Sequence, residues 1–217
     1  MYKTLTEQDS WLVLSAYRTG STVVAELIKY AYLRAGIELR ELLPVVPSRT
    51  DPILPKDLLK THDISELNLV NKNTTIVVIT RNPVESAISW LVKEQTGVWH
   101  FRPKEWNMWF NINTKYTPEP IDIKPFHVDP KNFIETYEAF VRFYKDLKIV
   151  LRDKNYIKIE YNEFKDQTSV LFDKLNLTPF KAIKKSLPVK TPGTPEQWIE
   201  NWEEISNIIK DLNTSTI

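Results

Sequence analysis

The chain has 217 residues, of which 42% are hydrophobic and 12% aromatic, so it can bury a sizeable core and most simply forms one domain over residues 1–217. Its 29 Lys and Arg residues nearly balance its 28 Asp and Glu residues, and the net charge of +1 argues against nucleic acid or an anionic membrane as a partner. Because there is no cysteine, disulfides, thiolate nucleophiles and cysteine-ligated metal sites are excluded.

The first stretch of the chain, MYKTLTEQDSW, is polar and lacks the apolar centre of a signal peptide. No apolar run in the sequence reaches the roughly 18 residues of a membrane-spanning helix. We therefore expect a cytoplasmic protein without a membrane span.

A strand, a short polar turn and a helix are predicted in succession over residues 11–36. Trp11 to Ala16 form an apolar run typical of a buried strand. After the turn, apolar residues recur at helical spacing up to Gly36, a natural helix end. These helical apolar positions are Val23, Val24, Leu27, Ile28 and Ala31.

Two more strands are predicted in the first half of the chain. One covers Leu58 to Thr61 in DLLKTHD and precedes a polar linker. The other covers Ile76 to Thr80 in TIVVITRNP and, as a continuous apolar run, is typical of a central parallel strand. Asn82 and Pro83 are then a typical N-cap and first-turn residue of a helix.

The second half of the chain continues the alternation of helices and strands. A long amphipathic helix is predicted at 133–151, a strand at 156–160 and a helix at 169–175. Thr194, Pro195 and Gln197 form a capping signal before a last helix whose apolar positions run from Trp198 to Leu212. The pattern predicts an α/β fold, a three-layer α/β/α arrangement with a central parallel sheet.

Residues 96–130 interrupt this pattern with five prolines and a cluster of aromatic residues. A long irregular insert of this kind is typical of a lid or binding loop, or of a disordered segment. The aromatic cluster fits a packed lid or an oligomer contact as well as a platform for an acceptor molecule. Its members are Trp99, Phe101, Trp106, Trp109 and Phe110.

The turn YRTGST, between the first strand and its helix, has the composition of an anion-binding loop. Backbone N–H groups and the dipole at a helix N-terminus attract phosphate. Gly20 permits close approach of the backbone, Ser21 and Thr22 add hydroxyl donors, and Arg18 adds charge. The turn lacks the Gly-Lys pair of a Walker A sequence. The alternative interpretation is a capped helix with a surface arginine.

A second candidate anion site follows the strand at 76–80. Arg81 comes directly after that strand, and Ser89 lies eight residues later, two turns along the following helix. A strand-end arginine and a helical serine can together hold a phosphate. Alternatively, Arg81 pairs with Glu85 and Ser89 packs against the sheet.

Lys60 and His62 alternate with Thr61, so both side chains point the same way from an extended segment. A cation and a titratable base on one side of a strand end suit a transfer reaction in which His62 takes a proton from an acceptor. His100 and His127 lie in the irregular insert without such a pattern and are not assigned a role.

These motifs resemble, in order and spacing, those of the sulfotransferases that use 3′-phosphoadenosine 5′-phosphosulfate (PAPS). YRTGST resembles the loop that binds the 5′-phosphosulfate, and RNPVESAIS resembles the element that binds the 3′-phosphate. LLKTHD resembles the Lys-Thr-His strand of the cytosolic members. The resemblance spans about residues 11–205, and its most specific motifs end near residue 90.

Two later segments extend the resemblance. IKIEYNEF resembles a strand whose tyrosine lies near the adenine, which implies this role for Tyr161. VKTPGTPEQWIENWEEI resembles the closing segment of shorter bacterial members, where a lysine such as Lys190 approaches the 3′-phosphate. The resemblance thus implies a PAPS site made of Arg18, Thr19, Gly20, Ser21, Thr22, Arg81, Ser89, Tyr161 and Lys190.

The sequence mixes motifs of two branches of the family. Arg18 stands where the cytosolic branch has lysine, as in the carbohydrate and tyrosyl-protein branches, and Val23 replaces the tryptophan that stacks on adenine. The Arg-Lys-Gly loop of the cytosolic branch is absent. In branches with a loop arginine a glutamate after the first helix often serves as the base, and the resemblance offers Glu41 as its counterpart, whereas the Lys-Thr-His stretch favours His62. We favour His62 because its ordinary pKa lies near working pH.

The resemblance implies transfer of a sulfuryl group from PAPS to a hydroxyl or amine without a metal ion. Arg18 and Lys60 would stabilise charge on the leaving phosphate, and His62 or Glu41 would act as the base. The acceptor stays open among small molecules, carbohydrates and peptides, and the oligomeric state stays open too. Two other classes are compatible: a P-loop small-molecule kinase, and a non-catalytic glycan- or peptide-binding module with a vestigial nucleotide site.

Overall fold

The computed structural model describes five segments of the chain: residues 4–42, 52–97, 123–164, 169–179 and 193–214. The chain divides into two compact units, residues 1–81 with 143–184 and residues 82–142 with 185–217. Within the five segments, no helix is long and apolar enough to cross a bilayer. That the whole chain acts as one domain stays a prediction.

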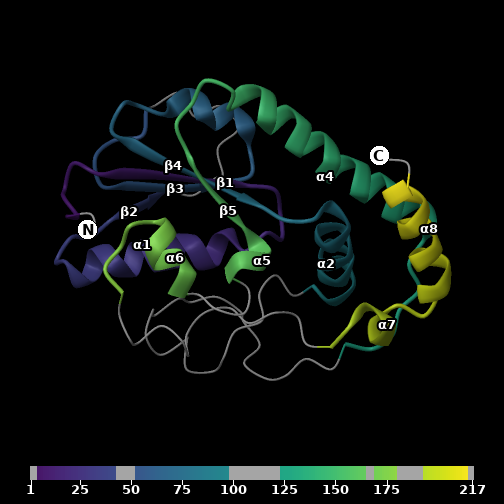
Figure 1. The fold of residues 1–217 in the computed structure, drawn as a ribbon. Helices are drawn as coiled ribbons and strands as arrows, with labels where there is room; N and C mark the ends of the chain where they lie inside the picture. Colours follow the sequence, from purple (N-terminus) through teal and green to yellow (C-terminus); the bar gives the residue numbers. More distant parts are fainter. Residues whose placement is uncertain (1–3, 43–51, 98–122, 165–168, 180–192, 215–217) are drawn as a thin grey trace. The chain divides into compact units, whose positions relative to one another are not determined.

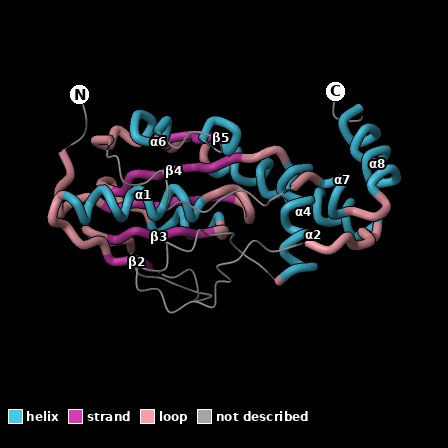
Figure 2. The backbone as a smooth tube through the Cα atoms, turned by 90° about the horizontal axis from the view of Figure 1, so that it is seen from below, coloured by secondary structure: helices cyan, strands magenta, loops and turns pink. Residues whose placement is uncertain are grey.

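The first unit is built on a five-stranded sheet in which all strand pairs are parallel. The strands lie side by side in the order β2-β3-β1-β4-β5 (Figure 2). This confirms the predicted α/β fold with a central parallel sheet. The strands are β1 Ser10–Ser15, β2 Arg40–Leu42, β3 Asp57–Thr61, β4 Thr74–Thr80 and β5 Ile157–Glu160.

One face of the sheet is covered by α1, Ser21–Arg34, which runs along the strands (Figure 1). Trp11 of β1 points to this side, and its Nε1 donates a hydrogen bond of 3.0 Å to the hydroxyl of Tyr32 on α1. Both side chains are fully buried, and their rings meet edge to face. The apolar residues at helical spacing therefore attach α1 to the sheet, as the periodicity predicts.

The opposite face is covered by the 3₁₀ helix η1, Ile64–Leu69, and by the last turns of α4, Pro130–Val150. Alternate residues of the strands point into this second core, since side chains alternate across a sheet. Helices on both faces give the predicted three-layer arrangement. Members of this core are Leu12, Leu14, Leu59, Leu67, Leu69, Ile76, Val78, Leu147 and Leu151.

The structure also contains elements that the sequence did not predict. The segment after β3, which was expected to be a polar linker, forms η1 because Leu67 and Leu69 are buried. Directly after β5 the chain turns into a short helix, α5, Tyr161–Phe164. The helix α6, Ser169–Lys174, follows at the predicted place.

The second unit contains α2, Pro83–Thr96, together with the amino-terminal part of α4 and the C-terminal helices. The predicted N-cap of α2 is confirmed, because Oδ1 of Asn82 accepts a hydrogen bond of 2.8 Å from Val84 N–H. Pro83 is the first residue of this helix, and Gly97 ends it in a left-handed conformation. Ser89 is buried on α2, with 8% of its surface exposed.

The prediction of a single long C-terminal helix from Trp198 to Leu212 is wrong. The chain instead forms α7, Pro195–Trp198, and α8, Trp202–Thr214. Ile199 is extended because it pairs in parallel with Phe126, whose N–H donates to the Trp198 carbonyl at 2.7 Å.

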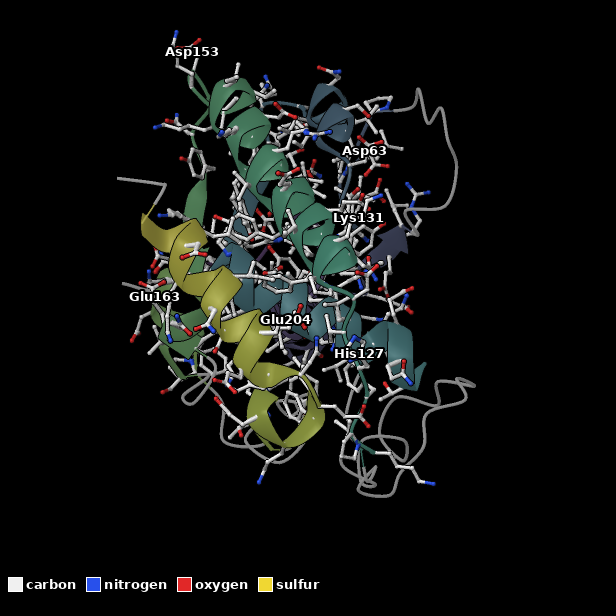
Figure 3. The ribbon with its side chains drawn as sticks, turned by 90° about the vertical axis from the view of Figure 1, so that its right-hand side faces the viewer. Asp63, His127, Lys131, Asp153, Glu163 and Glu204 are labelled. Atoms are coloured by element: carbon white, nitrogen blue, oxygen red, sulfur yellow. The ribbon has the colours of Figure 1, made fainter. Side chains whose placement is uncertain are left out.

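Asn201 strengthens this break between the two helices. Its side chain both donates to and accepts from the backbone of Val128, and its Nδ2 also donates to Glu204. Glu204 lies in the first turn of α8 (Figure 3). The predicted capping signal is present at the other end of α7, where Oε1 of Gln197 accepts from the Thr194 N–H at 2.9 Å.

The predicted irregular insert at 96–130 is described only in part. Thr96 still belongs to α2, and Pro130 already begins α4. All five aromatic residues of the predicted cluster, between Trp99 and Phe110, lie outside the described residues.

Candidate active site

The loop between β1 and α1 has an unusual backbone. Arg18 and Gly20 both adopt left-handed conformations, with φ of 64° and 83°. This region is costly for a residue with a side chain, so Arg18 needs contacts that hold it there. Thr19 supplies one contact inside the loop, since its buried hydroxyl donates to the Ala16 carbonyl at 3.0 Å. The Thr19 hydroxyl therefore shapes the loop.

Gly20 is the N-cap of α1, and no side chain caps this helix end. Ser and Thr are usual at an N-cap, where their oxygen satisfies a helix N–H. Here Ser21 and Thr22 come one position later, as the first two helical residues, and both are buried. An N-terminus of this kind, with its N–H groups and positive dipole, is suited to an anion.

Gly20 is also required by packing. A Cβ at this position would lie 2.9 Å from Cζ of Phe164 and 3.1 Å from Cδ2 of Tyr161. Helix α5 thus packs directly on the loop, which explains why the loop needs glycine for space as well as for its positive φ.

Lys60 reaches from β3 to the beginning of α1. Its Nζ donates a hydrogen bond of 3.1 Å to Oγ1 of Thr22. Because β3 is the neighbour of β1 in the sheet, the ammonium group lies at the same helix N-terminus as the loop. Lys60 and the loop therefore contribute positive charge to the same place, the N-terminus of α1.

His62 follows β3 and is held by the end of β1. Its Nδ1 lies 2.8 Å from the carbonyl oxygen of Ser15 and 3.4 Å from the Ser15 hydroxyl. A carbonyl oxygen can only accept, so Nδ1 carries the proton and Nε2 of the neutral ring carries the lone pair. The Tyr17 ring lies against the imidazole, with 4.1 Å between centroids.

The surroundings keep His62 neutral. Burial lowers the pKa of His62 to about 4, and the nearby charge of Lys60 acts in the same direction, while hydrogen bonds to the carbonyls of Ser15 and Ala16 oppose them. At neutral pH the imidazole therefore has an unprotonated nitrogen. The low pKa differs from the value near working pH expected from the sequence, and it makes the imidazole a weaker proton acceptor than an ordinary histidine.

Arg81 follows β4 on the other side of β1 and contacts the loop. Its Nη1 donates a hydrogen bond of 2.7 Å to the carbonyl of Arg18. Burial and, to a smaller extent, repulsion from Arg81 lower the pKa of Arg18, Tyr161 opposes them, and the resulting pKa is about 10. The site thus holds two cations close together, an arrangement that an anion would stabilise.

Two tyrosines support Arg81. Its guanidinium carbon lies 4.1 Å from the centroid of the Tyr161 ring, and its backbone N–H donates to the Tyr144 hydroxyl at 3.0 Å. In the structure the Tyr161 ring lies against Arg81 and Gly20, and its place near the adenine stays a prediction. Tyr144 and Tyr17 were not singled out by sequence reasoning, because only the fold brings them to Arg81 and His62.

Glu41 is not brought together with the other candidate residues. It pairs in register with Leu58, which is level with Trp11 near the beginning of β1, whereas the loop and His62 follow the opposite strand ends. Its carboxylate forms a partly exposed ion pair of 2.9 Å with Lys29. Ser89 belongs to the second unit, and Lys190 lies outside the described residues.

Comparison with known proteins gives structural likeness only. No protein-family model matches the sequence, and no curated protein matches it either. The chain is similar to a mouse sulfotransferase, SULT7A1, crystallised with PAP, at 16% identity over 81% of this chain and 62% of that one, with a TM-score of 0.40. It therefore spans less than two thirds of the mouse protein. A sulfotransferase from Alicyclobacillus acidocaldarius is similar at 14% identity over 95% and 93% of the two chains, with a TM-score of 0.42.

Proposed function

We propose that the chain is a sulfotransferase that moves a sulfuryl group from PAPS to a hydroxyl or amine of an acceptor. The observation that carries this proposal is the convergence of the Arg18 loop, Lys60, His62 and Arg81 at the carboxyl ends of three adjacent parallel strands. Open α/β sheets bind their ligands at this edge. The sequence motifs that carry the resemblance to PAPS-dependent enzymes are the segments that meet here.

The charges of the site fit a ligand with several anionic groups. Arg18 is destabilised as a cation by burial and by Arg81, and a bound anion would offset that cost. The N-terminus of α1, with glycine as its N-cap, adds backbone donors on the side of Lys60. A nucleotide with phosphate groups at both its 5′ and 3′ positions supplies negative charge for both arginines.

Each residue has a separate role in this proposal. PAPS, when bound, supplies a sulfuryl group whose bond to a 5′-phosphate oxygen breaks as a bond to the acceptor forms. Arg18 and Lys60 stabilise negative charge on the leaving phosphate, as preorganised donors do in phosphoryl transfer. His62 takes the acceptor proton on Nε2, while Ser15 holds the ring in the required tautomer.

The base assigned by this proposal is His62, and its place in the fold supports that choice over Glu41. His62 lies at the end of β1 that leads into the loop. Glu41 is level with the opposite strand ends and is paired with Lys29.

The nucleoside end of PAPS is assigned on the sequence motifs. Arg81 would hold the 3′-phosphate, and Tyr161 would support Arg81. The acceptor belongs to the same proposal as a small molecule, carbohydrate or peptide with a free hydroxyl or amine.

Isothermal titration of the purified protein with 3′-phosphoadenosine 5′-phosphate (PAP), ADP and ATP tests the proposal. PAP should bind at least about tenfold more tightly than ADP, because one charge-assisted hydrogen bond contributes roughly 1.5–3 kcal/mol. Equal affinities for PAP and ADP would remove PAPS as the donor. Magnesium-dependent turnover of ATP would indicate the kinase, and glycan or peptide binding without consumption of PAPS would indicate the binding module.

A further inference from the structure

Among the described residues of the first unit, three contacts hold Arg81. Its backbone N–H donates to the hydroxyl of Tyr144 on α4, and its guanidinium lies over the ring of Tyr161 on α5. Its Nη1 donates to the backbone carbonyl of Arg18 at 2.7 Å. Segments from both ends of this unit's sequence therefore determine where this one side chain lies.

The third contact acts on a strained part of the loop. Arg18 has φ of 64°, a conformation that a residue with a Cβ rarely keeps without support. A hydrogen bond from a charged donor is a strong one, and it holds the carbonyl of that residue in one direction. The next residues, Thr19 and Gly20, lead straight into the N-terminus of α1. Arg81 therefore contacts the loop directly before the N–H groups that begin α1.

We infer that Arg81 is a positioning residue for the Arg18 loop, so that it contributes to binding at the 5′ end of a nucleotide as well as at its 3′-phosphate. This inference rests on the proposed function for the identity of the ligand. Tyr144 and Tyr161 hold Arg81 in the position from which it acts on the loop. A residue that only contacts a 3′-phosphate would leave the affinity for ADP, which lacks that group, unchanged.

Two substitutions at Arg81 separate the contribution of its charge from the contribution of its hydrogen bond. Arg81→Met removes both the charge and the donor, whereas Arg81→Lys keeps the charge but loses the planar fork. Wild type and variants are titrated with PAP and with ADP. Hydrogen exchange of the ligand-free proteins is followed over residues 16–24, which cover the loop and the first turn of α1.

Arg81→Met should weaken binding of both PAP and ADP by at least about tenfold, and the loop amides should exchange faster in the absence of any ligand. Arg81→Lys should recover only part of both effects. The matched control is Arg152→Met, an exposed arginine in the turn after α4 of the same unit. It should change neither affinity nor loop exchange.

Tyr144→Phe is a milder variant in case Arg81→Met does not fold. It removes only the hydroxyl that accepts the Arg81 N–H. Loop amides should exchange faster than in wild type, with a smaller loss of affinity than in Arg81→Met. Unchanged loop exchange in Arg81→Met, or in Tyr144→Phe if Arg81→Met does not fold, would overturn the inference.

Two other results would also overturn the inference that Arg81 positions the loop. Arg81→Met that loses affinity for PAP alone, with wild-type affinity for ADP, would restrict Arg81 to the 3′-phosphate and overturn the inference. Full recovery of ADP binding by Arg81→Lys, with loop exchange unchanged, would assign the effect to charge alone and overturn it too. If wild type does not bind PAP more tightly than ADP, the proposed function fails. Hydrogen exchange of the ligand-free proteins still tests whether Arg81 stabilises the loop.

Discussion

The Nδ1 of His62 lies 2.8 Å from the backbone carbonyl of Ser15, which joins the residue after β3 to the last residue of β1. Side-chain carboxylates often orient a catalytic histidine, but here the acceptor is part of the sheet. Because Leu14 pairs with Thr61, the register of the two parallel strands brings Ser15 and His62 level. The tautomer of the imidazole is therefore set by strand pairing.

The low pKa of His62 predicts a dependence of stability on pH. Its folded value of about 4 lies below the ordinary 6.5, so between these values the unfolded chain binds a proton that the folded chain does not. The free energy of unfolding should fall as pH decreases through this window, by an amount on the order of 1–3 kcal/mol. Above pH 7 this contribution is fully present.

Urea unfolding at pH 7, 5.5 and 4.5 measures this effect. His62→Asn should lose less stability than wild type on acidification, because the titrating group is gone. His127→Asn, at an exposed position, should lose as much as wild type. An equal loss in wild type and His62→Asn would contradict the burial of the imidazole.

Tyr17 is predicted to maintain that burial. Its ring lies 4.1 Å from the imidazole, centroid to centroid, although 43% of its surface is exposed. Tyr17→Ala should admit water to His62 and raise the pKa of His62 from about 4 toward 6.5. NMR titration is practical because the chain has three histidines, and His62→Asn assigns the signal. Tyr156→Ala removes a tyrosine of similar exposure, 42%, and should leave the titration unchanged.

Gly20→Ala should weaken both folding and ligand binding, and Gly36→Ala provides its control. Both glycines have positive φ, 83° and 76°, but a Cβ at Gly36 meets nothing within 4 Å. Gly36→Ala should therefore cost about 1 kcal/mol of stability, the price of the left-handed backbone alone. Gly20→Ala adds contacts of 2.9–3.1 Å with Phe164 and Tyr161 and should cost more. Thermal melting and PAP titration of both variants measure the difference, and equal melting temperatures would mean that α5 does not press on the loop.

Much of the sheet follows from local sequence. Continuous apolar runs predict β1 and β4, and the polar residues after these strands mark the edge where Arg18 and Arg81 meet. By contrast, β2 consists of Arg40–Leu42, without an apolar run. It forms through pairing with β3 and through the bidentate ion pair of Arg40 with the buried Asp57, which links residues 17 positions apart.

The contacts that position the side chains of the candidate site join residues even farther apart in the sequence. Tyr144 lies 63 positions from Arg81, and His62 lies 47 positions from Ser15. No periodicity carries such information, because these contacts depend on how the strands are ordered and on where helices cross them. The same reasoning explains the broken C-terminal helix, whose interruption at Ile199 depends on Phe126. The choice between Glu41 and His62 likewise requires the strand register.

Lys60 is predicted to act on turnover more than on binding. Its ammonium lies at the first turn of α1, where it donates to Thr22, and in the proposed reaction it stabilises charge that grows on the leaving phosphate. Lys60→Met keeps the alkyl chain and removes the charge, so the rate of PAP release from PAPS, with water as acceptor, should fall by roughly 10²–10³-fold. PAP affinity measured by calorimetry should change by less than about tenfold, because Arg18 and the helix N-terminus still bind the phosphate. Lys158→Met, an exposed lysine of β5 paired with Glu160, should behave as wild type. A Lys60→Met variant that loses affinity and turnover in equal proportion would instead assign this lysine to binding of the nucleotide before the reaction begins.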